Sequence, residues 1–215
     1  MYHTILFDLD GTLTDPGPGI TNSVSYALQK FGIRVTDRTR LYKFIGPPLN
    51  ESFQEFLGFS VEESQRAVAY YREYYGEQGI YENQLYDGVE PLLEDLQAKG
   101  RKIVLATSKP EKFAVKILEH FHITNYFDFV AGSNMDGSRS KKAEVLTHAL
   151  KHLEITDKSS VVMVGDREHD IFGAEQVGID SIGVLYGYGS KEELRDAGAT
   201  YIVNVPEEIS DIIYR

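Results

Sequence analysis

Aspartates follow two apolar segments in a way that could gather several carboxylates. Asp8 and Asp10 come directly after the apolar run 5–7, and Asp166 comes directly after a second run, 161–165. The carboxyl ends of parallel strands form one edge of a sheet, which is where open parallel sheets bind ligands. We therefore expect these three side chains at one edge, although each also suits an ordinary turn or helix cap.

A fourth carboxylate follows at helical spacing. Asp170 lies about one helical turn beyond Asp166, where it could bind a metal, support another ligand or only stabilise the start of a helix. Crowded carboxylates raise one another's pKa, and a divalent cation resolves the conflict. Oxygens of Asp8 and Asp166 and the backbone carbonyl of Asp10 would suit Mg²⁺. We therefore expect a Mg²⁺ site at this edge of the sheet.

Hydroxyls and lysines occur at the ends of other expected elements. Thr107 and Ser108 follow the apolar run 102–106, where hydroxyls and free N–H groups could bind a phosphate or cap a helix. Lys141 and Lys142 precede a helical pattern and could neutralise the carboxylates, although such pairs are more often solvated surface. A functional role for these residues is favoured over capping or a solvated surface, because several strand and helix ends of one expected sheet each supply part of one site.

Apolar runs that alternate with helical patterns predict the fold. The runs lie at 2–8, 102–106, 160–165, 181–185 and 201–203, and a further strand is expected to end near Ser133 and Asn134. Helical patterns lie at 89–99, after Pro110 and at 145–153. This alternation indicates an α/β fold, with a Rossmann-like parallel sheet and helices on both faces.

The segment 15–86 departs from this alternation. It has helical patterns, clearest at 20–31 and 61–76, and little strand signal. We expect an α/β core domain of residues 1–14 and 87–215, with an inserted helical cap domain of residues 15–86. Opening and closing of this cap would admit a ligand and exclude water.

Composition and charge restrict the class of protein. The 215 residues are 42% hydrophobic and 26% charged, as in globular proteins, and include no cysteine, which excludes a cysteine nucleophile. The net charge of −11 argues against nucleic-acid polymers and anionic membranes as partners. No apolar run approaches the roughly 20 residues of a membrane helix, and no signal-peptide pattern is found. We expect a cytoplasmic protein that is a monomer or a weak homodimer.

The ordered motifs resemble those of the haloacid dehalogenase-like hydrolase superfamily. They are Asp8-Leu-Asp-Gly-Thr12, Thr107, Lys142 and Gly165-Asp-Arg-Glu-His-Asp170, and the resemblance covers essentially the whole chain. It implies a Mg²⁺-dependent phosphatase in which Asp8 is the nucleophile and Asp10 acts as acid and then base. It also implies that Thr107 and Lys142 stabilise the phosphoryl group, and that Asp166 completes the metal site with support from Asp170.

Closer similarities narrow the branch. The segments 44–49, 106–110, 132–137 and 186–189 look like those of the phosphoglycolate phosphatase and bacterial 5′-nucleotidase-like branch, and their combination leans towards the 5′-nucleotidases. The implied ligand is a small phosphorylated substrate. The residues expected to contact it are Gly11, Thr12, Ser108 and, in a loop of the cap, Gly46.

Several questions stay open in the sequence. Either Lys141 or Lys142 could fill the lysine position, and Lys142 is preferred because the usual helix then follows it. The cap tyrosines 70, 71, 74 and 75 suit the core of the cap better than contact with a nucleobase or sugar. A sugar phosphomutase of the same superfamily is an alternative. A dehalogenase would not need Asp10, a receiver domain would lack the inserted cap, and an interaction protein would not need the intact motifs.

Overall fold

The computed structural model describes residues 1–215, and the chain forms two compact units. One unit comprises Met1–Asp15 with Leu85–Arg215, and the other comprises Pro16–Gln84. The domain boundaries expected from the sequence are residues 15 and 86. Where the chain passes between the units, the short strands β2 (Thr14–Asp15) and β3 (Gln84–Leu85) pair with each other.

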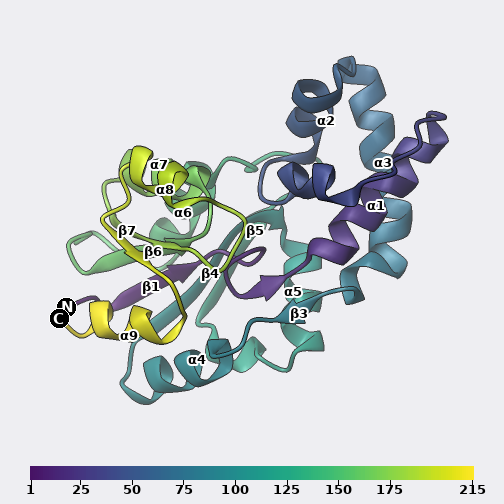
Figure 1. Cartoon of the computed structure of the whole chain (residues 1–215). Coiled ribbons are helices and arrows are strands. Elements are labelled where there is room, and N and C mark those ends of the chain that lie inside the picture. The colour runs from purple at the N-terminus through teal and green to yellow at the C-terminus, as the bar shows by residue number, and fades with distance from the viewer. The chain divides into compact units, whose positions relative to one another are not determined.

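Six parallel strands form the sheet of the first unit (Figure 1). They are β1 (Thr4–Phe7), β4 (Lys102–Pro110), β5 (Phe129–Ser133), β6 (Val161–Gly165), β7 (Asp180–Val184) and β8 (Tyr201–Val203). Their order is β5-β4-β1-β6-β7-β8, so β1 lies between β4 and β6. Thr4 of β1 is in register with Lys102 and with Val161. The predicted α/β class with a Rossmann-like parallel sheet is confirmed.

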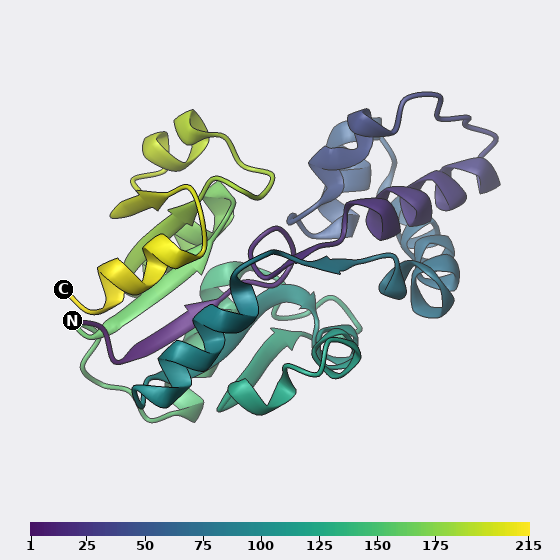
Figure 2. The same ribbon diagram turned by 60° about the horizontal axis from the view of Figure 1, so that its bottom comes forward.

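Helices cover both faces of this sheet. On one face, α6 (Lys142–His152) packs against α7 (Glu168–Val177), and α8 (Lys191–Asp196) lies beside α7 (Figure 1). On the other face lie α4 (Val89–Ala98), α5 (Glu111–His120), the short η3 (Thr124–Tyr126) and α9 (Glu207–Ile213). Figure 2 shows α4 and α9 side by side, with both chain termini near them. None of the helices combines the length and the apolar character that crossing a membrane requires.

The central strands are buried on both faces, which explains their continuous apolar sequence. Every residue of β1 and of β6 is buried. Leu6, Val104 and Met163 of three adjacent strands share one core cluster with Leu146 of α6 and Ala174 of α7. A leucine, valine or methionine side chain of this cluster contributes about 1.5–3 kcal/mol when it is fully buried. The residues that follow β1, β4 and β6 therefore start from firmly held strand ends.

The second unit is helical, as the sequence predicts for most of 15–86. Its elements are α1 (Gly17–Lys30), η1 (Arg38–Phe44), α2 (Leu49–Leu57), α3 (Val61–Glu77) and η2 (Gly79–Tyr81). A capping box begins α3: the Ser60 hydroxyl accepts from the Glu63 N–H, and the Glu63 carboxylate accepts from the Ser60 N–H. α1 packs along α3.

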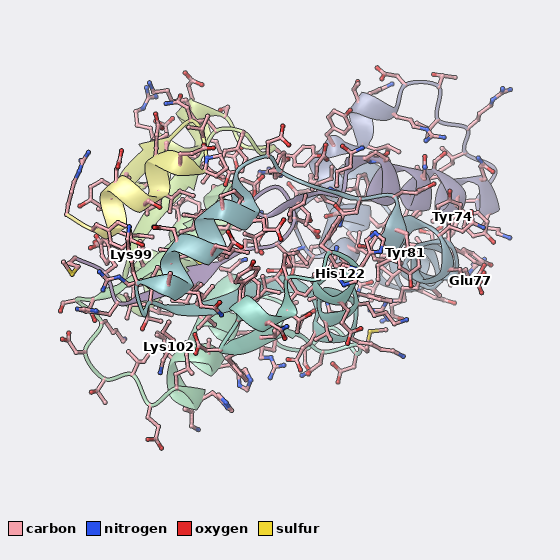
Figure 3. All side chains as sticks on the ribbon, turned by 90° about the horizontal axis from the view of Figure 1, so that it is seen from below. Tyr74, Glu77, Tyr81, Lys99, Lys102 and His122 are labelled. Carbon is pink, nitrogen blue, oxygen red and sulfur yellow. The ribbon has the colours of Figure 1, made fainter.

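The tyrosines of α3 divide between the core and the surface of this unit. Tyr71 and Tyr75 are 5% and 2% exposed, and their rings stack with centroids 5.2 Å apart. Tyr70 and Tyr74 are only partly buried, and the Tyr74 hydroxyl donates to Glu82. Figure 3 shows Tyr74 with Glu77 and Tyr81 around the C-terminal part of α3. The predicted core role is thus correct for two of the four tyrosines, Tyr71 and Tyr75.

Two glycines let α1 approach η2 closely. A Cβ atom on Gly19 would lie 2.0 Å from the carbonyl oxygen of Gly79, and one on Gly79 would lie 2.6 Å from the Ser23 hydroxyl. The Gly19 N–H also donates to the Glu82 carbonyl at 3.0 Å. This contact joins α1, the first helix of the unit, to η2 and the residues that follow it.

We predict that Gly19→Ala lowers the free energy of unfolding by about 1–3 kcal/mol, because the added methyl group meets backbone atoms that cannot rotate away. Urea denaturation followed by circular dichroism would measure the change. Gln29→Ala, on an exposed position of the same helix, should stay within about 0.5 kcal/mol of the unmodified protein. Equal effects of the two substitutions would contradict the close-approach argument.

Candidate active site

Three adjacent strands bring the predicted acidic and hydroxyl side chains to one edge of the sheet. Asp8 follows β1, Thr107 lies near the end of β4, and Asp166 follows β6. The Asp8 N–H donates to the Val164 carbonyl at 2.9 Å, which continues the pairing of β1 with β6 beyond the last residue of β1. Asp8 is therefore held by backbone hydrogen bonding next to Asp166.

The carboxylates at this edge are buried. Asp8, Asp10, Asp166 and Asp170 are 5%, 7%, 0% and 2% exposed. One oxygen each from Asp8, Asp166 and Asp170 lies within 4.8 Å of the others. Burial raises the pKa of Asp10 and of Asp170, and burial together with the charge of Asp170 raises the pKa of Asp166 well above its usual range. Positive charge is needed here if these groups are to be ionised.

Lys142 supplies part of that charge from the first turn of α6. Its ammonium donates to Asp8 Oδ1 at 2.7 Å and to the Ala106 carbonyl at 2.9 Å, and it pairs with Asp170 Oδ1 at 2.8 Å. Burial would lower the pKa of Lys142, but the charges of Asp170 and Asp8 raise it on balance above its usual range. Of the two candidate lysines, Lys142 lies among the carboxylates, whereas Lys141 is exposed.

Asp170 and Asp166 differ in the partners of their oxygens. Asp170 Oδ1 contacts Lys142, and Oδ2 accepts from the Arg167 N–H at 3.1 Å. Asp166 Oδ2 accepts from the Tyr188 N–H at 2.7 Å, but Asp166 Oδ1 is buried without a hydrogen-bond partner. Asp166 thus has an oxygen left for a cation, while Asp170 is suited to hold Lys142.

The backbone at two glycines, Gly11 and Gly187, packs closely against the side chain of Asp166. Gly11 has φ of +84°, a conformation that favours glycine, and a Cβ atom there would lie 2.1 Å from Asp166 Oδ2. A Cβ atom on Gly187 would lie 2.4 Å from the Cβ of Asp166. Gly11, predicted to contact the substrate, therefore lies against the carboxylate of Asp166, and any larger residue would displace that side chain.

The predicted hydroxyl residues have different surroundings. Thr107 is 2% exposed, and its hydroxyl accepts from the Lys109 N–H at 3.2 Å, while Ser108 beside it is partly exposed. Thr12 is fully buried and its hydroxyl has no hydrogen-bond partner, while its carbonyl accepts from the Tyr186 hydroxyl at 3.0 Å. Thr12 and Thr107 are thus both buried, and Ser108 is the most open of the three.

Gly46 belongs to the helical unit. It lies between η1 and α2 with φ of +104°, so the turn there favours glycine. The sheet edge with Asp8 belongs to the other unit. A contact of Gly46 with the substrate stays a prediction.

Two contacts at the site are not predicted by the sequence. The ammonium of Lys109, the residue after Ser108, contacts Asp10 Oδ2 at 2.5 Å. The segment 186–189 stands out in the sequence only through its similarity to the family, yet the backbone N–H of Tyr188 donates to Asp166. The position of Lys109 at a strand end was a usable signal for the first contact. Nothing local in the sequence marked the second.

The donor set fits a hard divalent cation. Asp8 and Asp166 offer carboxylate oxygens in a buried space, and Asp166 Oδ1 lacks any protein partner. Only oxygen atoms are available, which suits Mg²⁺ better than a softer metal. An oxygen of Asp170 also lies within 4.8 Å of theirs, but both oxygens of Asp170 already accept from protein donors.

The chain matches known proteins over most of its length. A family model described as haloacid dehalogenase-like hydrolase matches residues 5–184. A 5′-nucleotidase of Pseudomonas aeruginosa is 46% identical over 194 residues, which are 90% of this chain and 87% of that protein. The tyrosine-protein kinase PtkA of Mycobacterium tuberculosis is 41% identical over 201 residues, 93% of this chain and 68% of that protein. The crystal structure of a predicted phosphatase from Clostridium acetobutylicum, 48% identical, superimposes with a TM-score of 0.97 and covers 100% of this chain and 99% of its own.

We predict that Lys142→Met lowers the free energy of unfolding near neutral pH by about 3–5 kcal/mol, because it leaves Asp8 and Asp170 buried without their cation. The loss should shrink in acid, where protonation of the carboxylates removes the uncompensated charge. Urea titrations at both pH values would measure it. Lys141→Met, at the exposed neighbour, is the matched control and should change stability by no more than about 0.5 kcal/mol. A similar loss of stability in both variants would show that the loss does not come from leaving Asp8 and Asp170 without their cation.

Proposed function

The chain belongs to the haloacid dehalogenase-like hydrolase family and is a phosphatase, and we propose that it hydrolyses phosphate monoesters with Mg²⁺ through a phospho-aspartate on Asp8. The main support is the buried arrangement in which Lys142 joins Asp8 to Asp170 while Asp166 keeps one oxygen without a partner. This arrangement gives a fixed carboxylate nucleophile a positive charge beside it. It also leaves an anionic ligand for a cation.

In the first step, the free oxygen of Asp8 attacks phosphorus and the bond to the ester oxygen breaks. Lys142 holds the other oxygen, Oδ1, at 2.7 Å and so fixes the direction of the carboxylate. Asp10 gives a proton to the departing oxygen. Its raised pKa, which burial causes, favours the protonated form needed for that transfer. The product is an alcohol and a phosphoryl group on Asp8.

In the second step, a water molecule attacks the phosphorus atom of the phospho-aspartate. Asp10, now ionised, takes a proton from this water, and the bond between Asp8 and phosphorus breaks to release inorganic phosphate. The charge on the phosphoryl oxygens would be offset by Lys142 and by the Thr107 hydroxyl. Bound Mg²⁺ would supply further positive charge, held by carboxylates of Asp8 and Asp166 and the carbonyl of Asp10.

For the substrate, we favour small phosphorylated metabolites of the 5′-nucleotide type. The relative from Pseudomonas aeruginosa that is named a 5′-nucleotidase supports this choice, at 46% identity over 90% of this chain. Phosphoglycolate is the alternative substrate, and a sugar phosphomutase is the alternative reaction. A cytoplasmic location and a monomeric or weakly dimeric state stay predictions from the sequence.

We predict Mg²⁺-dependent release of inorganic phosphate from nucleoside 5′-monophosphates, with slower release from 2-phosphoglycolate and sugar phosphates. Asp8→Asn should abolish release, because an amide cannot act as the nucleophile, while its circular dichroism spectrum stays unchanged. A colorimetric phosphate assay with an EDTA control would measure both effects. Formation of an isomeric sugar phosphate, or phosphate transfer from ATP to protein tyrosine without ester hydrolysis, would argue for another reaction.

We predict that Mg²⁺ raises the melting temperature much more at about pH 7.5 than at about pH 4.5. Because the pKa of Asp166 is raised in the folded state, the folded protein binds more protons than the unfolded chain as this group titrates. The metal-free protein therefore loses stability as the pH rises, and a bound cation restores it. Differential scanning fluorimetry would measure these shifts.

The same experiment has matched variants. Asp166→Asn should melt higher than the unmodified protein without metal, since no buried carboxylate is left at this position, and it should respond little to Mg²⁺. Asp211→Asn, at an exposed position of α9, should keep the full response. A full Mg²⁺ response in Asp166→Asn would remove this residue from the metal site.

A further inference from the structure

A second lysine, Lys109, reaches into the site from β4. Its side chain is only 6% exposed, and its ammonium contacts Asp10 Oδ2 at 2.5 Å, across 99 residues of sequence. The proposed chemistry does not use this residue. Burying a lysine charge costs free energy, and the ion pair with Asp10 offsets this cost. The question is what the buried pair contributes to the site.

The two lysines divide the two neighbouring aspartates between them. Lys142 contacts Asp8 and Asp170, whereas Lys109 contacts Asp10. They come from different elements: Lys142 begins α6, and Lys109 lies at the end of β4. Each aspartate of the Asp8–Asp10 pair therefore has a cation of its own.

The pairing makes the two oxygens of Asp10 unequal. Oδ2 accepts from Lys109, whereas Oδ1 is buried and has no hydrogen-bond partner. An unpaired buried oxygen is costly unless a ligand or a proton completes it. Oδ1 is thus the atom of Asp10 that remains available for reaction, and the bond to Oδ2 prevents the carboxyl group from turning.

The backbone holds Asp10 less firmly than it holds Asp8, so a side-chain contact matters more for Asp10. Asp8 continues the backbone pairing of β1 with β6, whereas Asp10 lies in the following turn and forms only an isolated bridge with Thr14. Its side chain is consequently held less firmly by the sheet. A cation at the end of β4, the strand next to β1, can fix it from the side.

We propose that Lys109 is a positioning residue, which holds Asp10 by Oδ2 so that Oδ1 is the oxygen that transfers the proton. This inference rests on the proposed phosphatase function. As Asp8 attacks phosphorus and the ester bond breaks, the proton on Asp10 Oδ1 moves to the leaving oxygen. When water attacks the phospho-aspartate, one of its protons moves to the same Oδ1 and the Asp8–phosphorus bond breaks.

The test compares two esters that differ in their need for a proton. Nitrophenolate leaves phosphorus readily as an anion, whereas the sugar oxygen of a nucleoside 5′-monophosphate needs protonation. Because kcat/KM reports the steps up to formation of the phospho-aspartate, loss of Asp10 positioning should affect the two esters unequally. Lys109→Met should lower kcat/KM about 100-fold for the nucleotide and less than about 10-fold for p-nitrophenyl phosphate.

Rapid mixing gives a second readout. With p-nitrophenyl phosphate, Lys109→Met should release a burst of nitrophenol equal to the enzyme concentration and then turn over slowly, because Asp10 must also take a proton from water in the second step. Lys109→Arg should restore part of the nucleotide activity, since a guanidinium can also hold Oδ2. Lys112→Met, at an exposed lysine three residues along the chain, should match the unmodified protein.

A double-mutant cycle separates this role from a merely structural one. In an Asp10→Asn background, adding Lys109→Met should cause no further loss of nucleotide kcat/KM, because the group that Lys109 positions is already inactive. Circular dichroism would check that each variant is folded, and Lys109→Gln would replace Lys109→Met if the latter is not.

The outcomes are distinct. Equal losses of kcat/KM for both esters, with no burst, would mean that Lys109 binds the substrate phosphate and would overturn the inference. Additive losses in the double-mutant cycle, or no loss in Lys109→Met, would overturn it as well. If the unmodified protein releases no phosphate from either ester, the proposed function itself is wrong, and the role of Lys109 falls with it.

Discussion

The crowding of four buried carboxylates at one sheet edge is the constraint on which the rest of the site depends. Asp8, Asp10, Asp166 and Asp170 are each less than 10% exposed, and like charges this close oppose one another's ionisation. Lys142 offsets part of this repulsion by contacting Asp8 and Asp170 together. The cation that bridges the carboxylates also decides which of their oxygens remain free for a ligand.

The buried side chain of Lys142 also affects how α6 and α7 pack together. A Cβ atom on Gly173 of α7 would lie 2.6 Å from Cγ of Lys142, so the stem of the lysine passes through space that any other residue would fill. A Cβ atom on Gly165 would similarly meet the carboxyl carbon of Asp170 at 2.3 Å. The glycines at 173 and 165 thus leave the space that the side chains of Lys142 and Asp170 occupy.

Backbone N–H groups offset further negative charge of the buried carboxylates. The N–H groups of Tyr188 and Arg167 donate to Asp166 and Asp170. Tyr188 also donates its hydroxyl to Asp15, the last residue of the first unit before the chain leaves it. One loop therefore contacts both the acid with a free oxygen and the segment that leads to the helical unit.

The strands and the acids at their ends could be predicted because both signals are local. A continuous apolar run identifies a strand buried on both faces, and Asp8 and Asp166 follow such runs directly. β5 was harder to define, since Phe129–Ser133 is short and contains both glycine and serine. The choice between Lys141 and Lys142 could be argued only from the expected helix start, because exposure and burial of neighbouring residues depend on how that helix packs.

Contacts between distant residues could not be predicted in the same way, and they determine the chemistry in detail. Asp8 and Asp10 belong to one motif and look equivalent in the sequence, yet one continues a strand and the other lies in a turn. That difference in backbone support changes what each carboxylate requires. In the proposed mechanism the nucleophile Asp8 must be fixed in direction, and its place at the end of β1 and its contact with Lys142 serve this purpose. In the same proposed mechanism Asp10 must present one oxygen for proton exchange, and a cation on its other oxygen would limit its rotation without occupying the reactive atom. The asymmetry of the two oxygens of Asp10 is therefore a property of the folded edge, produced by a lysine from the neighbouring strand.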